Sequence, residues 1–342
     1  MPRKKIILSF DYELFFGYKS GTVRKSLIEP TNKMLDAMDQ VGAKATYFVD
    51  YLMLKYLEKE NDKRCNSDLE LIKEQLCEIL RRGHRIELHI HPHWIDAKYN
   101  GDGTWNFEDF SHYMLTSFSV GEIENMFNEG TKIINQIARG VIPNYCVVAF
   151  RAGGWALPEM DIVSSSFLRN NIKLDSSLGR GIFINDGYRN IDCTKMPSKS
   201  YYRISTDALR EDVKGCFIEA PISTFKYSFF DRLVNGVYRK FHKNEMKYQC
   251  DGTHARKVVS DETPGVMEKI KRVISTKVNF YTLSHFSPLL LKNKFFHYDK
   301  DLVIIIDHPK DFSDSSIKTL LLISKSNEFT TYEQIINESN NE

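Results

Sequence analysis

The chain has 342 residues, of which 42% are hydrophobic, and its 47 Lys and Arg against 45 Asp and Glu give a formal net charge of +2. These values are typical of a folded globular protein and argue against disorder or low complexity. So balanced a charge gives no indication of nucleic-acid binding. No apolar stretch of the sequence approaches the ~20 residues that span a bilayer. The first apolar run ends at Asp11 and Glu13, too early for a signal peptide. We therefore expect a cytoplasmic protein whose six scattered cysteines are reduced thiols.

Short apolar runs alternate along the chain with stretches that have helical spacing. The runs predicted to form strands are 6–10, 45–49, 85–90, 146–150, 172–174, 216–222, 279–283 and 302–306. The predicted helices are 30–41, 67–82, 120–138, 158–170 and 314–325, the second of which opens with a capping box from Ser67 to Glu70. This alternation predicts an α/β fold with a mainly parallel sheet, and about seven to eight strands suit a barrel-like closure.

Two regions interrupt the alternation. Residues 95–118 are rich in Gly, Asp, Asn and aromatic residues and are predicted to form a long surface loop. Residues 223–275 contain a helical pattern followed by a polar stretch, which indicates an insertion within one domain spanning residues 1–342. Within this insertion, residues 239–248 are basic and aromatic. They form either a solvated helix face or a patch for a phosphate-bearing carrier or an anionic membrane surface.

Polar residues with catalytic capability follow several of the predicted strands. The carboxyl ends of parallel strands meet at one edge of a sheet, where ligands bind. We therefore expect these side chains to form a single site. They are Asp11, Glu13, His89, His91, His93, Arg151, Asp175, Asp307 and His308.

The three histidines of ELHIHPHW are the clearest indication of a bound metal, because imidazole nitrogen is a preferred ligand of Zn²⁺ and similar ions. If the chain stays extended, His89 and His93 are about 13 Å apart and His89 pairs better with His91. If the chain curls after His89, the pair His89 and His93 can converge, and Pro92 favours leaving the strand. Asp11 and Glu13 face the same side of an extended segment, and their like charges indicate a shared cation or a general base.

The segments SFDYE, KATYFV, GHRIELHIHPHW, FRAGGW, LDSS and IIIDHPK, in this order, resemble the polysaccharide deacetylases of the NodB-homology family. The resemblance extends from residue 6 to about residue 335 and is closest to the branch associated with surface-polysaccharide and lipopolysaccharide biosynthesis. It implies a distorted (β/α) barrel. It also implies hydrolysis of a sugar acetyl group, above all an N-acetyl group, with Zn²⁺ or alternatively Co, Ni, Fe or Mn.

The resemblance also implies roles for individual residues. Asp11 would be the catalytic base, oriented by Arg151. The metal ligands would be Glu13, His89 and His93, with His91 lying near the substrate. Asp175 would hold His308, which would act as the general acid.

The expected substrate is an acetylated sugar or a carrier-linked glycan, with peripheral membrane contact as a further expectation. Trp94 and Trp155 either stack on sugar faces or pack in the core, and Glu219 ends another strand where it would contact substrate. Two alternatives remain open. The same site could cleave the C–N bond of a small amide. Because the first and third motifs depart from the family pattern, the chain could also be a catalytically inactive, glycan-binding relative.

Overall fold

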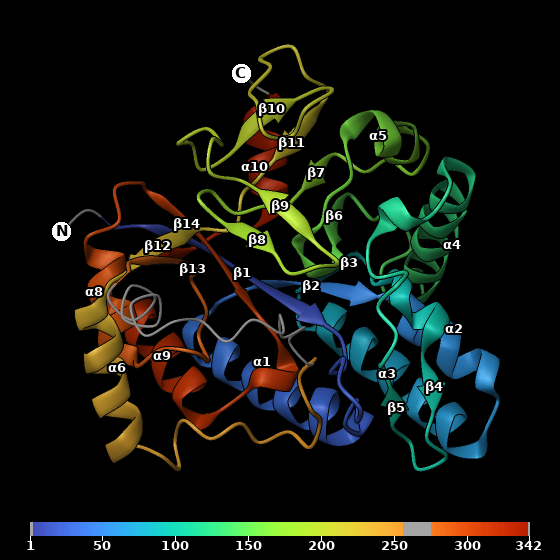
Figure 1. Ribbon diagram of the computed structural model, residues 1–342, viewed down its shortest axis with the longest axis horizontal. Coiled ribbons are helices and arrows are strands. Elements are labelled where there is room, and N and C mark those ends of the chain that lie inside the picture. The colour runs from blue at the N-terminus through green and yellow to red at the C-terminus, as the bar shows by residue number, and fades with distance from the viewer. Residues whose placement is uncertain (1–2, 256–274, 341–342) are drawn as a thin grey trace.

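The computed structural model describes residues 3–255 and 275–340 and is built on one curled sheet (Figure 1). Its strands follow the order β10-β11-β7-β6-β3-β2-β1-β14, and β15 pairs with β1. Every pair is parallel except β10 with β11, so eight strands take part in parallel pairing. The predicted α/β fold is confirmed. The strands are β1 (Lys5–Tyr12), β2 (Ala45–Asp50), β3 (Arg85–Ile90), β6 (Ala149–Ala152), β7 (Leu174–Asp175), β10 (Tyr202–Ile204), β11 (Phe217–Glu219), β14 (Leu302–Asp307) and β15 (Glu328–Phe329).

Irregular chain, rather than a strand pair, lies between β11 and β14. After β11, the N–H of Ser223 donates to the carbonyl of Ile304 over 2.9 Å, and the N–H of Ile306 donates to the carbonyl of Tyr281 over 3.1 Å. Pro221 precedes this contact and has no N–H to donate to a ladder. The sheet therefore forms a distorted barrel that irregular chain completes on this side.

The helices lie on both sides of the sheet. Figure 1 shows α1, α3 and α9 on one side and α10 on the other. The helices are α1 (Glu29–Val41), α2 (Tyr51–Glu60), α3 (Lys63–Arg81), α4 (Val120–Arg139), α5 (Met160–Arg169), α6 (Phe229–Phe241), α8 (Pro288–Phe296), α9 (Asp314–Ser324) and α10 (Tyr332–Asn340). Short helical turns occur at η1 (Arg24–Ile28), η2 (Pro92–Asp96), η3 (Leu115–Ser117), η4 (Gly153–Trp155) and η5 (Pro309–Asp311).

The predicted start of α3 is wrong. The helix begins at Lys63, and the side chain of Asp62 caps it by accepting from the N–H groups of Arg64 and Cys65. Asp caps a helix as well as Ser does, and Asp62 lies about one turn before the predicted cap, Ser67. None of the described helices is both long and apolar enough to cross a membrane.

The two faces of the sheet have separate hydrophobic cores. The larger core packs against the outer helices, and the smaller one fills the concave face, where Ile7, Phe48 and Ala149 meet Tyr332 and Ile335 of α10. Side chains alternate along a strand. The residues two and four positions after Ile7, which are Ser9 and Asp11, therefore also point to the concave face.

Three shorter sheets lie outside the barrel. β12 (Thr224–Tyr227) pairs with β13 (Lys277–Phe280), β4 (Lys98–Tyr99) with β5 (Trp105–Asn106), and β8 (Phe183–Asn185) with β9 (Asn190–Asp192), all antiparallel.

The first of these pairs corrects one expectation. Residues 279–283 do not form one strand of the main sheet: the first two belong to β13, which pairs with β12 from the insertion, whereas the carbonyl of Tyr281 accepts from the N–H of Ile306 on β14. Of the predicted insertion 223–275, residues 256–274 lie outside the described chain, and its place within a single domain stays a prediction. Residues 95–118 are not simply a surface loop, since Trp105, Phe107 and Tyr113 are buried.

Candidate metal and catalytic site

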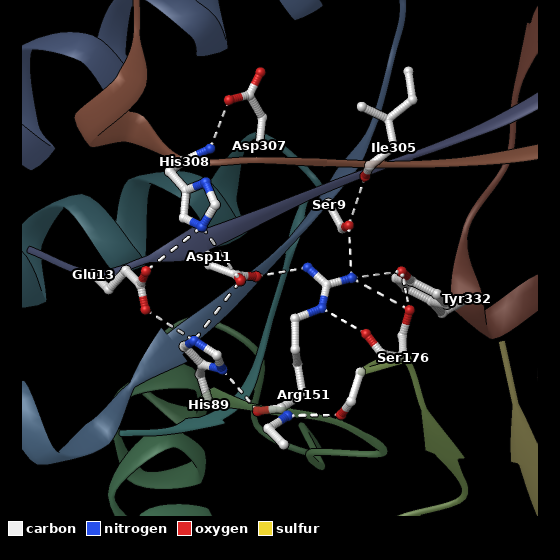
Figure 2. Close-up of polar contacts among 12 residues, drawn as sticks. Ser9, Asp11, Glu13, His89, Arg151, Ser176, Ile305, Asp307, His308 and Tyr332 are labelled. Atoms are coloured by element: carbon white, nitrogen blue, oxygen red, sulfur yellow. Dashed lines mark hydrogen bonds and ion pairs between the residues drawn. The ribbon is translucent and has the colours of Figure 1, made fainter. Parts of the chain in front are cut away.

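Four parallel strands of the main sheet, β6, β3, β1 and β14, supply the candidate site together with the turns that follow them. Asp11 lies on β1 and Glu13 just after it, His89 lies on β3, Arg151 on β6, and His308 directly after β14. The structure brings these five side chains together at the carboxyl ends of the strands (Figure 2). This is the edge at which their positions in the sequence predicted a site.

Glu13, His89 and His91 form a compact set of metal-ligand atoms. Oε2 of Glu13 lies 3.0 Å from Nε2 of His89 and 2.7 Å from Nε2 of His91. All three residues are buried, and their ligand atoms lie within 4.8 Å of one another. Within residues 3–255 and 275–340, no other group of His, Cys, Asp and Glu meets this condition. One carboxylate and two imidazoles are a donor set that Zn²⁺ and related ions accept.

His91 occupies the place in this cluster that the family resemblance implied for His93. The chain stays extended through Ile90, so His89 and His91 alternate onto the same face, and the turn η2 begins only at Pro92. His93 instead stacks on Tyr113 and Phe110, with ring centroids 4.8 and 5.7 Å away. Both of its ring nitrogens are buried without a hydrogen-bond partner among the described residues, and burial holds its pKa well below the usual value.

Hydrogen bonding prepares His89 to act as a ligand. Its Nδ1 lies 2.7 Å from the carbonyl oxygen of Arg151, which can only accept, so Nδ1 carries a proton and Nε2 points to Glu13. Burial lowers the pKa of His89, but Asp11 and Glu13 outweigh it and raise the pKa to about 9. With its pKa raised, the ring also carries a proton on Nε2 at neutral pH, facing the carboxylates. A metal ion bound at Nε2 would take the place of this proton. The pKa of His91 is lowered to about 4 by burial, so this ring is neutral, as a ligand must be.

Gly153 lets the third motif approach His91 closely. A Cβ at this position would lie 2.6 Å from Nδ1 of His91 and 2.6 Å from the carbonyl oxygen of Ile90. The first Gly of FRAGGW is therefore required by contact with the histidine segment.

Arg151 fixes Asp11 from the centre of the concave face. Its Nη1 lies 2.6 Å from Oδ1 of Asp11, and its Nη2 donates to Ser9 Oγ and to Tyr332 Oη over 2.9 and 3.1 Å. The other oxygen of Asp11 lies 3.6 Å from Nε2 of His308. Burial raises the pKa of Asp11, but Arg151 and the neighbouring histidines outweigh it and lower the pKa. Asp11 is therefore an ionised carboxylate with one oxygen held and one directed into the site.

Lys310 and Asp311 are two site residues that the sequence analysis did not single out. Nζ of Lys310 donates to Oε1 of Glu13 over 2.7 Å, which leaves Oε2 for the histidines. Burial raises the pKa of Glu13, but Lys310 and His91 hold it well below the usual value. Oδ2 of Asp311 lies 3.5 Å from Nδ1 of His308. Both residues follow His308 within the turn η5, and their position after a strand end is the signal that could have revealed them.

The structure does not bring Asp175 to His308, which corrects the implied pairing. Asp175 is in register with Phe150, one position away from Arg151, and therefore points to the opposite face of the sheet. There it accepts from the N–H and the hydroxyl of Ser177 over 2.8 and 2.7 Å. Glu219 is in register with Asp175 and completely buried on the same face, which also separates it from the cluster.

The two tryptophans expected at the substrate differ in position. Trp94 is completely buried, donates from Nε1 to Oδ2 of Asp50 over 2.6 Å, and packs against Trp105, so it belongs to the core. Trp155 is half-buried and stacks obliquely on Phe280. Of the two, Trp155 is the one that a ligand can reach.

Comparisons with known proteins give only distant likenesses. No protein-family model and no curated protein sequence matches the chain. Among solved structures, it is similar to a candidate polysaccharide deacetylase from Mycobacterium smegmatis, at 10% identity and a TM-score of 0.47 over 99% of this chain and 91% of that one. It is also similar to the peptidoglycan deacetylase PdaC from Bacillus subtilis, at 12% identity and a TM-score of 0.41 over 99% and 92%.

A third similar structure is BA3943 from Bacillus anthracis, a pseudoenzyme of carbohydrate esterase family 4, at 10% identity and a TM-score of 0.42 over 98% of this chain and 66% of that one. Identities and TM-scores this low do not assign the chain to a family.

Proposed function

We propose that this protein is a divalent-metal-dependent deacetylase that hydrolyses an N-acetyl group of a sugar during surface-polysaccharide or lipopolysaccharide biosynthesis. The observation that carries the proposal is the cluster of Glu13, His89 and His91 beside Asp11, an ionised carboxylate held by Arg151. The segments that resemble the NodB-homology deacetylases contribute all five of these residues.

The residues of the cluster fit a divalent ion, which would be held by Glu13, His89 and His91. An ion bound there would supply Lewis-acid polarisation of the acetyl carbonyl and would lower the pKa of water. Lys310 keeps one oxygen of Glu13 occupied, so the carboxylate presents its other oxygen to the histidines. Zn²⁺ is the ion that best matches two imidazoles and one carboxylate, and Co, Ni, Fe and Mn accept the same donors.

The protein's own side chains would then move the protons. Asp11 takes the proton of the attacking water through the oxygen that Arg151 leaves free, a contribution of about 10²–10⁴-fold. Nε2 of His308 lies 3.6 Å from the oxygen of Asp11 that Arg151 leaves free, and His308 donates a proton to the departing amine. Asp311 at Nδ1 of His308 fixes the ring so that Nε2 faces the reacting groups.

The experiment that tests the proposal begins with metal content. The purified protein is incubated with Zn²⁺ and separately with Co²⁺, and bound metal is measured by elemental analysis. We expect roughly one ion per chain, lost in His89→Ala and in His91→Ala. His93→Ala is the matched control, because it removes an imidazole from the same segment without touching Glu13. Loss of metal in His93→Ala with retention in His91→Ala would overturn this ligand set.

Acetate release from N-acetylglucosamine oligosaccharides and UDP-N-acetylglucosamine then tests the reaction. Asp11→Asn should keep its metal and lose acetate release by about 10²-fold or more. Metal loss in that variant would make Asp11 a ligand. Absence of bound metal under both conditions would sink the catalytic proposal in favour of an inactive, glycan-binding protein. Metal binding with hydrolysis of simple cyclic amides but of no acetylated sugar would favour the amide hydrolase.

A further inference from the structure

The helix α6 packs against the protein with its polar side. Oδ1 of Asn235 accepts from the N–H of Ser287 over 2.8 Å, and Asp231 forms an ion pair of 2.7 Å with Lys294 of α8. Asn235 is the residue of this helix that the structure buries. A surface helix ordinarily buries its apolar stripe and exposes its polar one, so α6 is oriented the opposite way.

The apolar stripe of α6 faces outward as a consequence. Phe230 and Phe241 are 74% and 77% exposed, and the residues between them on this stripe are also largely exposed. Their spacing of three, four, seven and eleven residues from Phe230 places them on one side of the helix. Figure 1 shows α6 at the outer edge of the molecule beside α8. We define the α6 apolar face as Phe230, Leu233, Val234, Val237 and Phe241.

The segment that carries this face is rich in basic residues. Between residues 226 and 247 the sequence has six Lys and Arg against two Asp and Glu. Both acidic residues are already paired, Asp231 with Lys294 and Glu245 with Lys318 over 2.8 Å. Lys240 and Lys243, near the end of the helix, are exposed. Arg239 lies on the packed side, where it donates to the carbonyl of His285, so Lys240 and Lys243 are the exposed basic groups next to the apolar face. Neither carboxylate of this segment is without a partner.

We propose that the α6 apolar face inserts into the interface of a membrane that contains anionic lipid, with the surrounding lysines on the lipid phosphates. An outward apolar stripe bordered by Lys and Arg is the pattern of helices that lie in the plane of a bilayer surface. A second copy of the chain is a poorer occupant. In a two-fold dimer the same patch would face itself, so the lysines of one copy would meet the other copy's patch. That patch has no unpaired carboxylate to pair with them.

Docking would also hold the candidate site near the lipid headgroups. Nη1 of Arg239 on α6 donates to the carbonyl of His285 over 3.3 Å, and Nε2 of His285 lies 3.5 Å from Asp311, the neighbour of His308. The helix is thus connected to the site by two contacts. Membrane binding itself follows from the charge and exposure of α6 and does not depend on the proposed deacetylase activity.

Co-sedimentation of the full chain with vesicles tests the proposal. We compare vesicles of equimolar phosphatidylglycerol and phosphatidylcholine with vesicles of phosphatidylcholine alone. We expect binding to the anionic vesicles that weakens with added salt. The double substitution Phe230→Ser with Phe241→Ser should lower the partition coefficient by about tenfold or more. Lys240→Glu with Lys243→Glu should lower it by about tenfold or more as well.

The matched control is Val213→Ser, because Val213 is 75% exposed and lies in the turn between β10 and β11, away from α6. It should bind as the unsubstituted protein does. Because all the substituted side chains are exposed, circular dichroism should show unchanged folding.

Failure of the unsubstituted protein to bind anionic vesicles at low salt would overturn the proposal, as would undiminished binding by the double serine variant. A lipid-independent dimer that the serine variant dissociates, with no vesicle binding, would assign the face to a second copy instead.

Discussion

Carboxylates lie on both sides of the His308 ring, and they differ in what they can do. Asp11 and Glu13 face Nε2 at 3.6 and 3.5 Å, whereas Asp311 faces Nδ1 at 3.5 Å. Because the turn η5 carries Asp311 three residues after His308, the two side chains are placed by the same short segment. A carboxylate at Nδ1 selects the tautomer and holds the ring in position. We propose this positioning function for Asp311, in place of the expected Asp175.

Asp311→Asn should therefore lower kcat by about 10–10² and leave KM and metal content near those of the unsubstituted protein. Asp311→Glu should recover part of the loss, because it restores a carboxylate in the same turn. Steady-state kinetics of acetate release measures both. The comparison variant is Asp175→Asn, on the other face of the sheet. If Asp175→Asn abolished turnover at constant stability while Asp311→Asn did not, the assignment would be wrong.

At the scale of elements, two buried carboxyl groups stand side by side on β7 and β11. Asp175 and Glu219 are register partners and both are completely buried. Burial raises the pKa of Glu219 well above its usual value, with a further rise from Asp175, and burial also raises the pKa of Asp175. In the unfolded chain Glu219 has its ordinary, lower pKa. The folded state therefore binds more protons, and stability falls as pH rises from the unfolded pKa through the folded one.

Glu219→Gln should remove much of this pH dependence. An amide has nearly the same shape, does not ionise and can still donate a hydrogen bond to Asp175. We expect the free energy of unfolding to decline with pH in the unsubstituted protein by on the order of 1 kcal/mol per pH unit within that window. The variant should show a flatter profile and higher stability at neutral and alkaline pH. Urea unfolding across a pH series measures this, and parallel profiles for the two proteins would contradict it.

The elements themselves could largely be predicted from the sequence, for a physical reason. Fully apolar runs such as 302–306 indicate strands buried on both faces, and this one became β14. The run NFYTL at 279–283 is less apolar and does not form one strand. Its first two residues lie in β13, which pairs with β12 of the insertion, and no local pattern encodes that pairing. The His segment illustrates the same limit. Spacing allowed either His91 or His93 beside His89, and the two are distinguished by how far β3 stays extended.

At the scale of the whole molecule, the contacts that complete the site come from the far end of the chain. Tyr332 opens α10 and reaches Arg151, 181 residues away, with its hydroxyl 3.1 Å from Nη2. The same hydroxyl lies 2.8 Å from Oγ of Ser176 and the ring packs edge-on to Phe48. A single tyrosine within a C-terminal helix gives no sequence signal for this function. The position of α10 across the concave face is what makes Tyr332 part of the support of Asp11.

Tyr332→Phe tests whether this support matters for catalysis as well as for folding. The substitution keeps the ring but leaves Arg151 and Ser176 without one buried partner, which should cost about 1–3 kcal/mol of unfolding free energy. Because Arg151 directs Asp11, kcat should also fall by about 3–10-fold with metal content and KM unchanged. Tyr201→Phe is the matched control, since its hydroxyl also contacts α10, at Glu338 over 3.4 Å, but on the exposed surface. That change should alter stability by less than about 0.5 kcal/mol and leave kcat unaffected. A Tyr332→Phe protein that is less stable but fully active would show that α10 supports the fold alone and that Ser9 and Ser176 suffice to hold Arg151 against Asp11.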